Sequence, residues 1–101
     1  MKMMSGLSKY QPKTMKHFKS SMGSVLKEGV LDTKTKELID IGTSIAAKCK
    51  YCIAIHVEKA LSDRATKEEI FEATTLVILM DGGPTMTYVC EVKNAFDNYM
   101  S

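Results

Sequence analysis

The stretch ELIDIGTSIAAKCKYCIAIH, residues 37–56, gathers a carboxylate, two thiols and an imidazole. If its second half is helical, Cys49 and Cys52 are three positions apart and Cys52 and His56 four, so all three side chains project from one face. Two sulfur atoms this close can join as a disulfide, and the imidazole can take a proton from a thiol. Glu37 is too far along the chain to reach His56 within one helix, so we expect it to return from a neighbouring helix and orient the imidazole or accept its proton. The spacing predicts a site that generates a thiolate.

The spacing Glu-x11-Cys-x2-Cys-x3-His resembles the motif of the alkyl hydroperoxidase D-like branch of the carboxymuconolactone decarboxylase family. Glu37, Cys49, Cys52 and His56 fill its four fixed positions. The run GGPTMTYV, residues 82–89, resembles the Gly-Gly-Pro helix start that follows the active-site hairpin in this family. The likeness covers residues 31–100, and the cysteine pair is its discriminating part, because we expect the ring-opening decarboxylases of the family to lack it.

The resemblance implies an all-α fold: a single small domain of about five helices with a central helical hairpin. We expect a flexible N-terminal segment over residues 1–11 and the alkyl hydroperoxidase D-like domain over residues 12–101. A chain of 101 residues can bury only one modest core, and several short amphipathic helices leave apolar faces that self-association would cover. The resemblance implies that this homo-oligomer is a trimer or a hexamer.

Apolar periodicity predicts one helix that starts at Pro12 and ends before Gly29. Its apolar stripe consists of Met15, Phe18, Met22, Val25 and Leu26. Asp32 is the expected N-cap of the next helix, whose stripe is Leu38, Ile41 and Ile45.

No glycine or proline occurs between Gly42 and Gly82, so periodicity alone permits a single helix from Asp32 to about Leu61. The resemblance implies instead a break at residues 47–50, with the first cysteine at a helix start. A helix N-terminus lowers the pKa of a thiol, so this placement would favour a thiolate.

Two further helices are expected after the hairpin. Thr66 and Glu69 form a capping box at the start of one, and Gly82-Gly83 ends it. Pro84 should start the last helix. The core-facing residues of these helices and of the second arm of the hairpin are expected to be Ile53, Val57, Ala60, Leu61, Ile70, Phe71, Thr74, Val77, Ile78, Val89, Val92, Phe96 and Tyr99. We expect Cys90 to be a small buried apolar residue and His17 to lie on the surface.

Composition narrows the possible compartments and cofactors. No uninterrupted apolar stretch is long enough for a membrane span and no signal peptide is visible, so we expect a cytoplasmic protein that does not bind membranes. Three cysteines, two of them in Cys-x-x-Cys, fit a reducing compartment and a catalytic pair. Neither G-x-G-x-x-G nor a P-loop is present, so we expect no nucleotide or flavin cofactor.

Charge is unevenly distributed along the chain. Residues 1–27 carry six lysines and no acid, whereas the remainder carries eight basic and twelve acidic residues. Without interleaved aromatic residues, or any arginine before Arg64, this basic segment is not expected to bind nucleic acid. A solvated helix face, or contact with the acidic body of a neighbouring subunit, fits better.

The resemblance implies a redox enzyme, a thiol-disulfide oxidoreductase with peroxidase or disulfide reductase activity and an antioxidant role. Its substrate would be a hydroperoxide or a disulfide, and its reductant a lipoyl-bearing or thioredoxin-like protein. Cys52 would attack, because it lies one turn from His56, and Cys49 would close the disulfide. Tyr51, inside the pair, would line the substrate approach.

Four other interpretations stay open. The same fold could carry a decarboxylase with His56 as base, or a non-enzymatic redox sensor or adaptor. Cys49, Cys52, His56 and Glu37 could bind zinc, although structural zinc ligands usually come from two separate knuckles, and we expect no metal here. The thiols and the histidine could also simply be buried.

Overall fold

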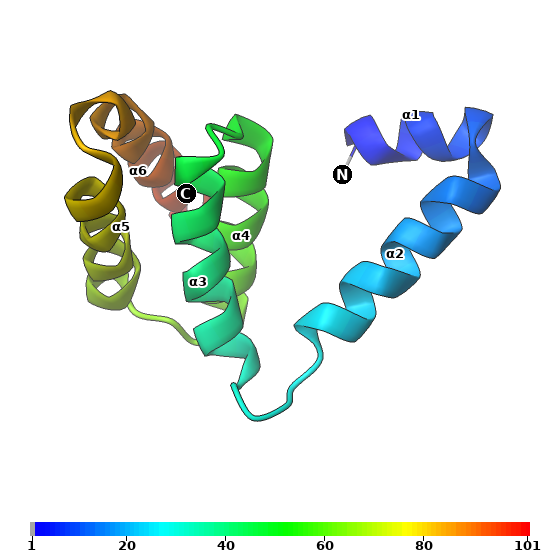
Figure 1. The fold of residues 1–101 in the computed structure, drawn as a ribbon, viewed down its shortest axis with the longest axis horizontal. Helices are drawn as coiled ribbons and strands as arrows, with labels where there is room; N and C mark the ends of the chain where they lie inside the picture. Colours follow the sequence, from blue (N-terminus) through cyan, green and yellow to red (C-terminus); the bar gives the residue numbers. More distant parts are fainter. Residues whose placement is uncertain (1) are drawn as a thin grey trace.

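The computed structural model describes the backbone of residues 2–101 and the side chains from residue 6 onward. Its elements in chain order are α1 (Lys2–Tyr10), α2 (Pro12–Leu26), α3 (Thr33–Ala46), α4 (Lys50–Ser62), α5 (Lys67–Asp81), the 3-10 helix η1 (Gly83–Thr85) and α6 (Met86–Met100). Within the described residues there is no strand, which confirms the all-α prediction. Helices α3 and α4 form the expected central hairpin (Figure 1).

Helices α3 to α6 make up the body of the molecule. Helix α3 packs against both α4 and α5, and α6 packs against α4 and α5 (Figure 1). The buried apolar core consists of residues from the predicted stripes, Ile41, Ile45, Ile53, Val57, Ala60, Ile70 and Val92, together with Ala65 from the α4–α5 connection, which was not predicted. Gly42 lets α3 approach α5 closely, since a Cβ atom at that position would lie 3.2 Å from the Val77 side chain.

The predicted helix starts are confirmed at α3 and α5. Asp32 is the N-cap of α3, and its side chain accepts a hydrogen bond from the Thr35 backbone N–H at 2.7 Å. Thr66 and Glu69 form both hydrogen bonds of the capping box at the start of α5. The backbone N–H of Thr66, followed by the Lys34 ammonium, lowers the pKa of Glu69, so the carboxylate stays ionised at neutral pH.

The hairpin breaks within the predicted residues 47–50. The backbone N–H of Ala47 still bonds to carbonyls of α3, and Lys48 then adopts a left-handed conformation with φ of 57°. Cys49 follows as the N-cap of α4. A non-glycine residue rarely adopts positive φ, which explains why no local sequence signal marked this turn.

The connection between α5 and α6 differs in detail from the prediction. Gly82 ends α5 with φ of 75°, a conformation that glycine adopts without steric cost. Pro84 lies in the 3-10 helix η1, and α6 begins only at Met86. The expected start of the last helix at Pro84 is therefore two residues early.

The prediction that Cys90 is buried is wrong, because its side chain is exposed. Val92 is the fully buried residue of α6, and a residue two positions before it lies about 200° away around the helix. Tyr99, expected in the core, is also exposed. His17 is exposed, as predicted.

Helices α1 and α2 form an arm that stands apart from the body (Figure 1). Within the expected flexible segment, residues 2–10 form helix α1, which packs against α2, and Gln11 is the N-cap of α2. Residue 1 lies outside the described residues. The stripe predicted on α2 is covered only in part: Met15 is buried, whereas Phe18 and Val25 are 51% and 64% exposed. The division into segment and domain stays a prediction.

Across residues 2–101, every helix is too short or too polar to cross a lipid bilayer.

The capping box at the start of α5 provides a stability test. Thr66→Ala removes the hydroxyl that accepts from the Glu69 backbone N–H, and should lower the free energy of unfolding by about 1 kcal/mol. Urea denaturation followed by circular dichroism measures this change. Thr75→Ala is the matched control, because the Thr75 hydroxyl bonds only to a carbonyl within α5. An equal loss in both variants would show that Thr66 does not act as a cap.

Candidate active site

A buried contact between a carboxylate and an imidazole joins the two arms of the hairpin. Glu37 on α3 is only 2% exposed, and its two carboxylate oxygens lie 2.9 and 3.2 Å from Nδ1 of His56 on α4. A buried carboxylate without a partner would be costly, so this contact supplies the partner that Glu37 needs. Glu37 thus approaches His56 from a neighbouring helix, as expected from the sequence.

The contact determines which nitrogen of His56 can act as a base. An ionised carboxylate only accepts hydrogen bonds, so Nδ1 must donate to it. In the neutral imidazole the free lone pair then lies on Nε2, at the opposite side of the ring. The His56 side chain is 18% exposed, so a small part of the ring reaches the surface. The contact with Glu37 thus holds the His56 ring in one orientation.

Asp40 is a further carboxylate at this site that sequence analysis missed. Its Oδ2 atom lies 3.6 Å from Nδ1 of His56, and its side chain is 32% exposed. The signal was present in the spacing, because Asp40 follows Glu37 by three positions and shares its face of α3.

The two cysteines of the motif are joined in this structure as a disulfide. The Cα atoms of Cys49 and Cys52 are 5.2 Å apart, within the range usual for disulfides. Cys49 is the N-cap of α4, and its sulfur accepts from the backbone N–H of Cys52 at 3.3 Å. Cys52 sits in the first turn of α4 and His56 one turn further along. The residues of the motif are therefore held on two adjacent helices.

Charged and aromatic residues surround the disulfide. Lys48 and Lys50 are exposed beside it, and the Lys50 ammonium lies 4.0 Å from a carboxylate oxygen of Glu91 on α6. Tyr51 is 63% exposed, so its ring is available to a molecule that approaches the sulfurs. A role in lining the substrate approach stays a prediction for Tyr51.

Two hollows lie beside the first turns of α3, one lined in part by Glu37 and the other in part by Asp40. One has a volume of about 200 Å³ and is lined by Leu26, Thr33, Glu37, Lys59, Ser62 and Asp63. The other, of about 300 Å³, is lined by Val25, Leu26, Leu31, Lys36, Ile39 and Asp40. Leu26, the last residue of α2, borders both, so the end of the arm forms one wall of each hollow.

Glu37, Asp40 and His56 could offer three ligand atoms to a metal ion, since these atoms lie within 4.8 Å of one another. Glu37 and Asp40 both approach the same Nδ1 atom of His56, at 2.9 and 3.6 Å, which brings the three groups together. The zinc set considered from the sequence needs both sulfurs as thiolates, and in this structure they are bonded to each other.

Comparison with known proteins agrees with this fold. The model of the carboxymuconolactone decarboxylase family matches residues 12–94. An uncharacterised protein of Cupriavidus necator is 33% identical over 91 residues, which cover 90% of this chain and 80% of that protein. An uncharacterised protein encoded in the cox locus of Paracoccus denitrificans is 37% identical over 73 residues, covering 72% of this chain and 66% of that protein.

Solved structures show the same architecture. A carboxymuconolactone decarboxylase family protein from Legionella pneumophila, in its apo form, superposes with a TM-score of 0.92 at 33% identity over 99% of this chain and 89% of that one. A protein of the same family from Thermotoga maritima, for which a part in antioxidative response has been suggested, gives a TM-score of 0.79 at 28% identity, covering 84% and 88% of the two chains. The chain belongs to the carboxymuconolactone decarboxylase family.

The geometry predicts unequal reactivity of the three thiols. After reduction, Cys52 should react with iodoacetamide near neutral pH faster than Cys49 or Cys90, because only Cys52 has a base one helical turn away. Mass spectrometry of the labelled peptides over time gives the three rates. Cys90 serves as an internal control, since it is an exposed thiol outside the motif. Equal rates at Cys52 and Cys90 would contradict the assignment of His56 as its base.

Glu37→Gln tests the role of the buried carboxylate. The amide keeps the shape of the side chain but cannot hold His56 as an ionised acceptor, so alkylation of Cys52 should slow by about tenfold with little change in melting temperature. Glu58→Gln, an exposed position on α4, is the matched control and should behave as wild type. A Glu37→Gln protein that melts early yet keeps the reactivity of Cys52 would show that Glu37 is structural.

Proposed function

We propose that the chain is a thiol-disulfide oxidoreductase that reduces hydroperoxides or disulfides through Cys49 and Cys52. The observation that carries this proposal is the placement of the cysteine pair at the start of α4, one turn from an imidazole whose Nδ1 is held by buried Glu37. Decarboxylation needs no second thiol, so the pair itself favours redox chemistry over the reaction that gives the family its name.

The first step is attack by the Cys52 thiolate. Nε2 of His56 takes the thiol proton, and the resulting imidazolium is stabilised by the Glu37 carboxylate. The thiolate attacks one oxygen of a hydroperoxide and breaks the O–O bond. The departing alkoxide takes a proton from His56 and leaves as an alcohol, while Cys52 becomes a sulfenic acid. With a disulfide substrate, the same attack gives a mixed disulfide and releases a thiol.

Cys49 completes the oxidation. Its sulfur accepts the Cys52 backbone N–H and lies at the positive end of α4, an environment that favours a thiolate. Attack on the Cys52 sulfenic acid forms the intramolecular disulfide and releases water. The two thiols thus have separate sources of activation, His56 for Cys52 and the helix N-terminus for Cys49.

A dithiol then reduces the Cys49–Cys52 disulfide to two thiols. Its first thiolate attacks the Cys49–Cys52 disulfide to form a mixed disulfide, and its second thiol releases the reduced protein and leaves oxidised. A lipoyl-bearing or thioredoxin-like protein supplies this dithiol in our proposal. A reducing compartment such as the cytoplasm suits this cycle. Three cysteines, an odd number, fit such a compartment better than a framework of structural disulfides. We also propose that the chain self-associates as a trimer or a hexamer.

Substitution of each cysteine tests the proposal. With an organic hydroperoxide and dihydrolipoamide, Cys52→Ser should lose at least about a hundredfold of its turnover, since the attacking thiolate is gone. Cys49→Ser should still form a sulfenic acid at Cys52, trapped by dimedone, but should not cycle. Coupled consumption of NADH through a lipoamide reductase measures turnover, and mass spectrometry identifies the sulfenic acid.

Cys90→Ser is the matched control, because it removes an exposed thiol outside the motif and should leave turnover unchanged. Full peroxide turnover by Cys52→Ser would refute the proposal. Wild-type protein that decarboxylates a lactone acid, and does so equally well as Cys52→Ser, would assign the site to the decarboxylase alternative with His56 as base. A disulfide that forms reversibly without any turnover would favour the sensor or adaptor alternative.

A further inference from the structure

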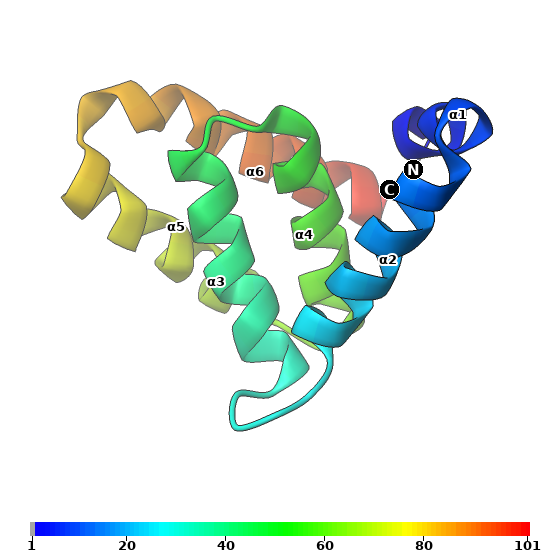
Figure 2. The same ribbon diagram turned by 45° about the vertical axis from the view of Figure 1, so that its right-hand side comes forward.

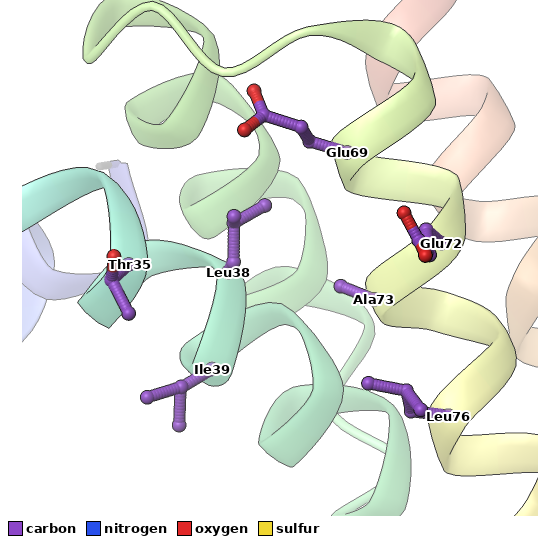
Figure 3. A pocket seen from close by; sticks show the side chains of 7 residues that line it. All are labelled: Thr35, Leu38, Ile39, Glu69, Glu72, Ala73 and Leu76. Carbon is purple, nitrogen blue, oxygen red and sulfur yellow. The ribbon is translucent and has the colours of Figure 1, made fainter.

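An apolar groove with an acidic edge runs between α3 and α5. It has a volume of about 390 Å³ and is lined by Thr35, Leu38, Ile39, Glu69, Glu72, Ala73 and Leu76 (Figure 3). Ile39 and Leu76 are 51% and 63% exposed, so the body leaves these large side chains uncovered. Glu69 is already paired with Lys34 at 2.9 Å, which leaves Glu72, on the exposed face of α5, as the available acid. We call this feature the α3–α5 groove.

The arm carries a surface of matching chemistry. Phe18, Met22 and Val25 fall on one face of α2, and none of them is buried. This face, which we call the arm stripe, lies in a segment that has six lysines and no acidic residue over residues 1–27. Lys19 lies about 90° from the centre of the arm stripe, beside it, whereas Lys13 lies on the opposite side of α2.

The arm stripe and the α3–α5 groove have matching lengths. From Phe18 to Val25 the arm stripe spans seven positions, and from Glu69 to Leu76 the groove spans seven positions along α5. At 1.5 Å per residue both are about 10 Å long. An amphipathic helix that lays its apolar face into a groove uses this spacing of anchors.

In this arrangement the arm does not lie over the groove of its own chain. Val25, at the end of α2, lines a hollow with Ile39, but the α3–α5 groove itself is lined by residues of α3 and α5. Helix α2 lies on the far side of the α3–α4 hairpin from α5 in both views (Figures 1 and 2). The ammonium group of Lys36 on α3 also donates to the carbonyl oxygens of Val25 and Lys27, at 2.8 and 2.6 Å. These bonds hold the end of α2 at the start of its own α3.

We propose that the α3–α5 groove binds the α2 helix of a second copy of this chain, with Phe18 against Leu76, Val25 against Ile39 and Lys19 near Glu72. The inference builds on the self-association proposed above and is independent of the thiol chemistry. Each copy carries one arm and one groove, so the contact closes as a reciprocal pair or as a ring. Binding covers the apolar surfaces that both elements leave exposed.

Sedimentation velocity at micromolar concentration tests the surface. Wild-type protein should be oligomeric, and either Phe18→Glu or Leu76→Glu should raise the dissociation constant at least about tenfold, because each buries a charge in the apolar contact. Both side chains are more than half exposed, so the variants should keep their helical content by circular dichroism. A wild-type monomer, or association unchanged by both variants, would overturn the proposal.

Charge reversal supplies the matched control. Glu72→Lys should weaken association, and adding Lys19→Glu to the same chain should restore it. Lys13→Glu makes the same change of charge on the opposite side of α2, and it should leave the association of the wild type and of Glu72→Lys as it was. If Lys13→Glu restored the association of Glu72→Lys as well as Lys19→Glu does, the effect would come from net charge, and the proposed contact between Lys19 and Glu72 would be wrong.

Cross-linking identifies the occupant. In chains whose three native cysteines are serine, Phe18→Cys on one chain and Leu76→Cys on a second, differently tagged chain should form a mixed disulfide on oxidation. If a chain with both substitutions links only to itself, the groove binds its own arm and the proposal is wrong. Cys52 alkylation in Phe18→Glu is a separate measurement, so failure of the thiol chemistry and failure of this contact can be distinguished.

Discussion

The buried hydrogen bonds between Glu37 and His56 are the constraint on which the rest of the structure depends. An ionised carboxylate at 2% exposure is tolerated only if a donor meets it, and that donor comes from a different helix. Helices α3 and α4 must therefore run side by side in a single register. The isoleucines of both helices provide this register, because Ile41, Ile45 and Ile53 are fully buried in the same core. The apolar packing and the polar pair thus require the same arrangement of the hairpin.

Much of this arrangement could be predicted from residues alone, and the reasons are local. The Asp32 cap, the Thr66–Glu69 box and the left-handed Gly82 are signals contained in a few neighbouring positions. The turn of the hairpin is different, because it depends on Lys48 at positive φ, which no propensity favours. Only the likeness to a family placed that break, and with it the helix start at Cys49.

The errors have equally physical causes. Cys90 is expected to be buried because free cysteines often are, whereas the angle around α6 places it on the outer face. Periodicity identifies the apolar stripe of α2. It does not show whether the residues that pack against this stripe belong to the same chain or to another one. In the structure Phe18 and Val25 are not covered by the body, a result of tertiary arrangement that no local pattern encodes.

Successive residues at the start of α3 project about 100° apart around the helix and serve three different contacts. Lys36 bonds to the carbonyls at the end of α2, Glu37 turns inward to His56, and Leu38 and Ile39 line the α3–α5 groove. The Asp32 cap sets the rotational phase of all of them, because it determines where the helix begins. A point substitution here alters the contact of one side chain. An inserted or deleted residue between Asp32 and Ile39 would instead rotate every later position by about 100°, more than a quarter turn. Between Asp32 and Ile39 the fold therefore depends on the length of the segment more strictly than on any single side chain.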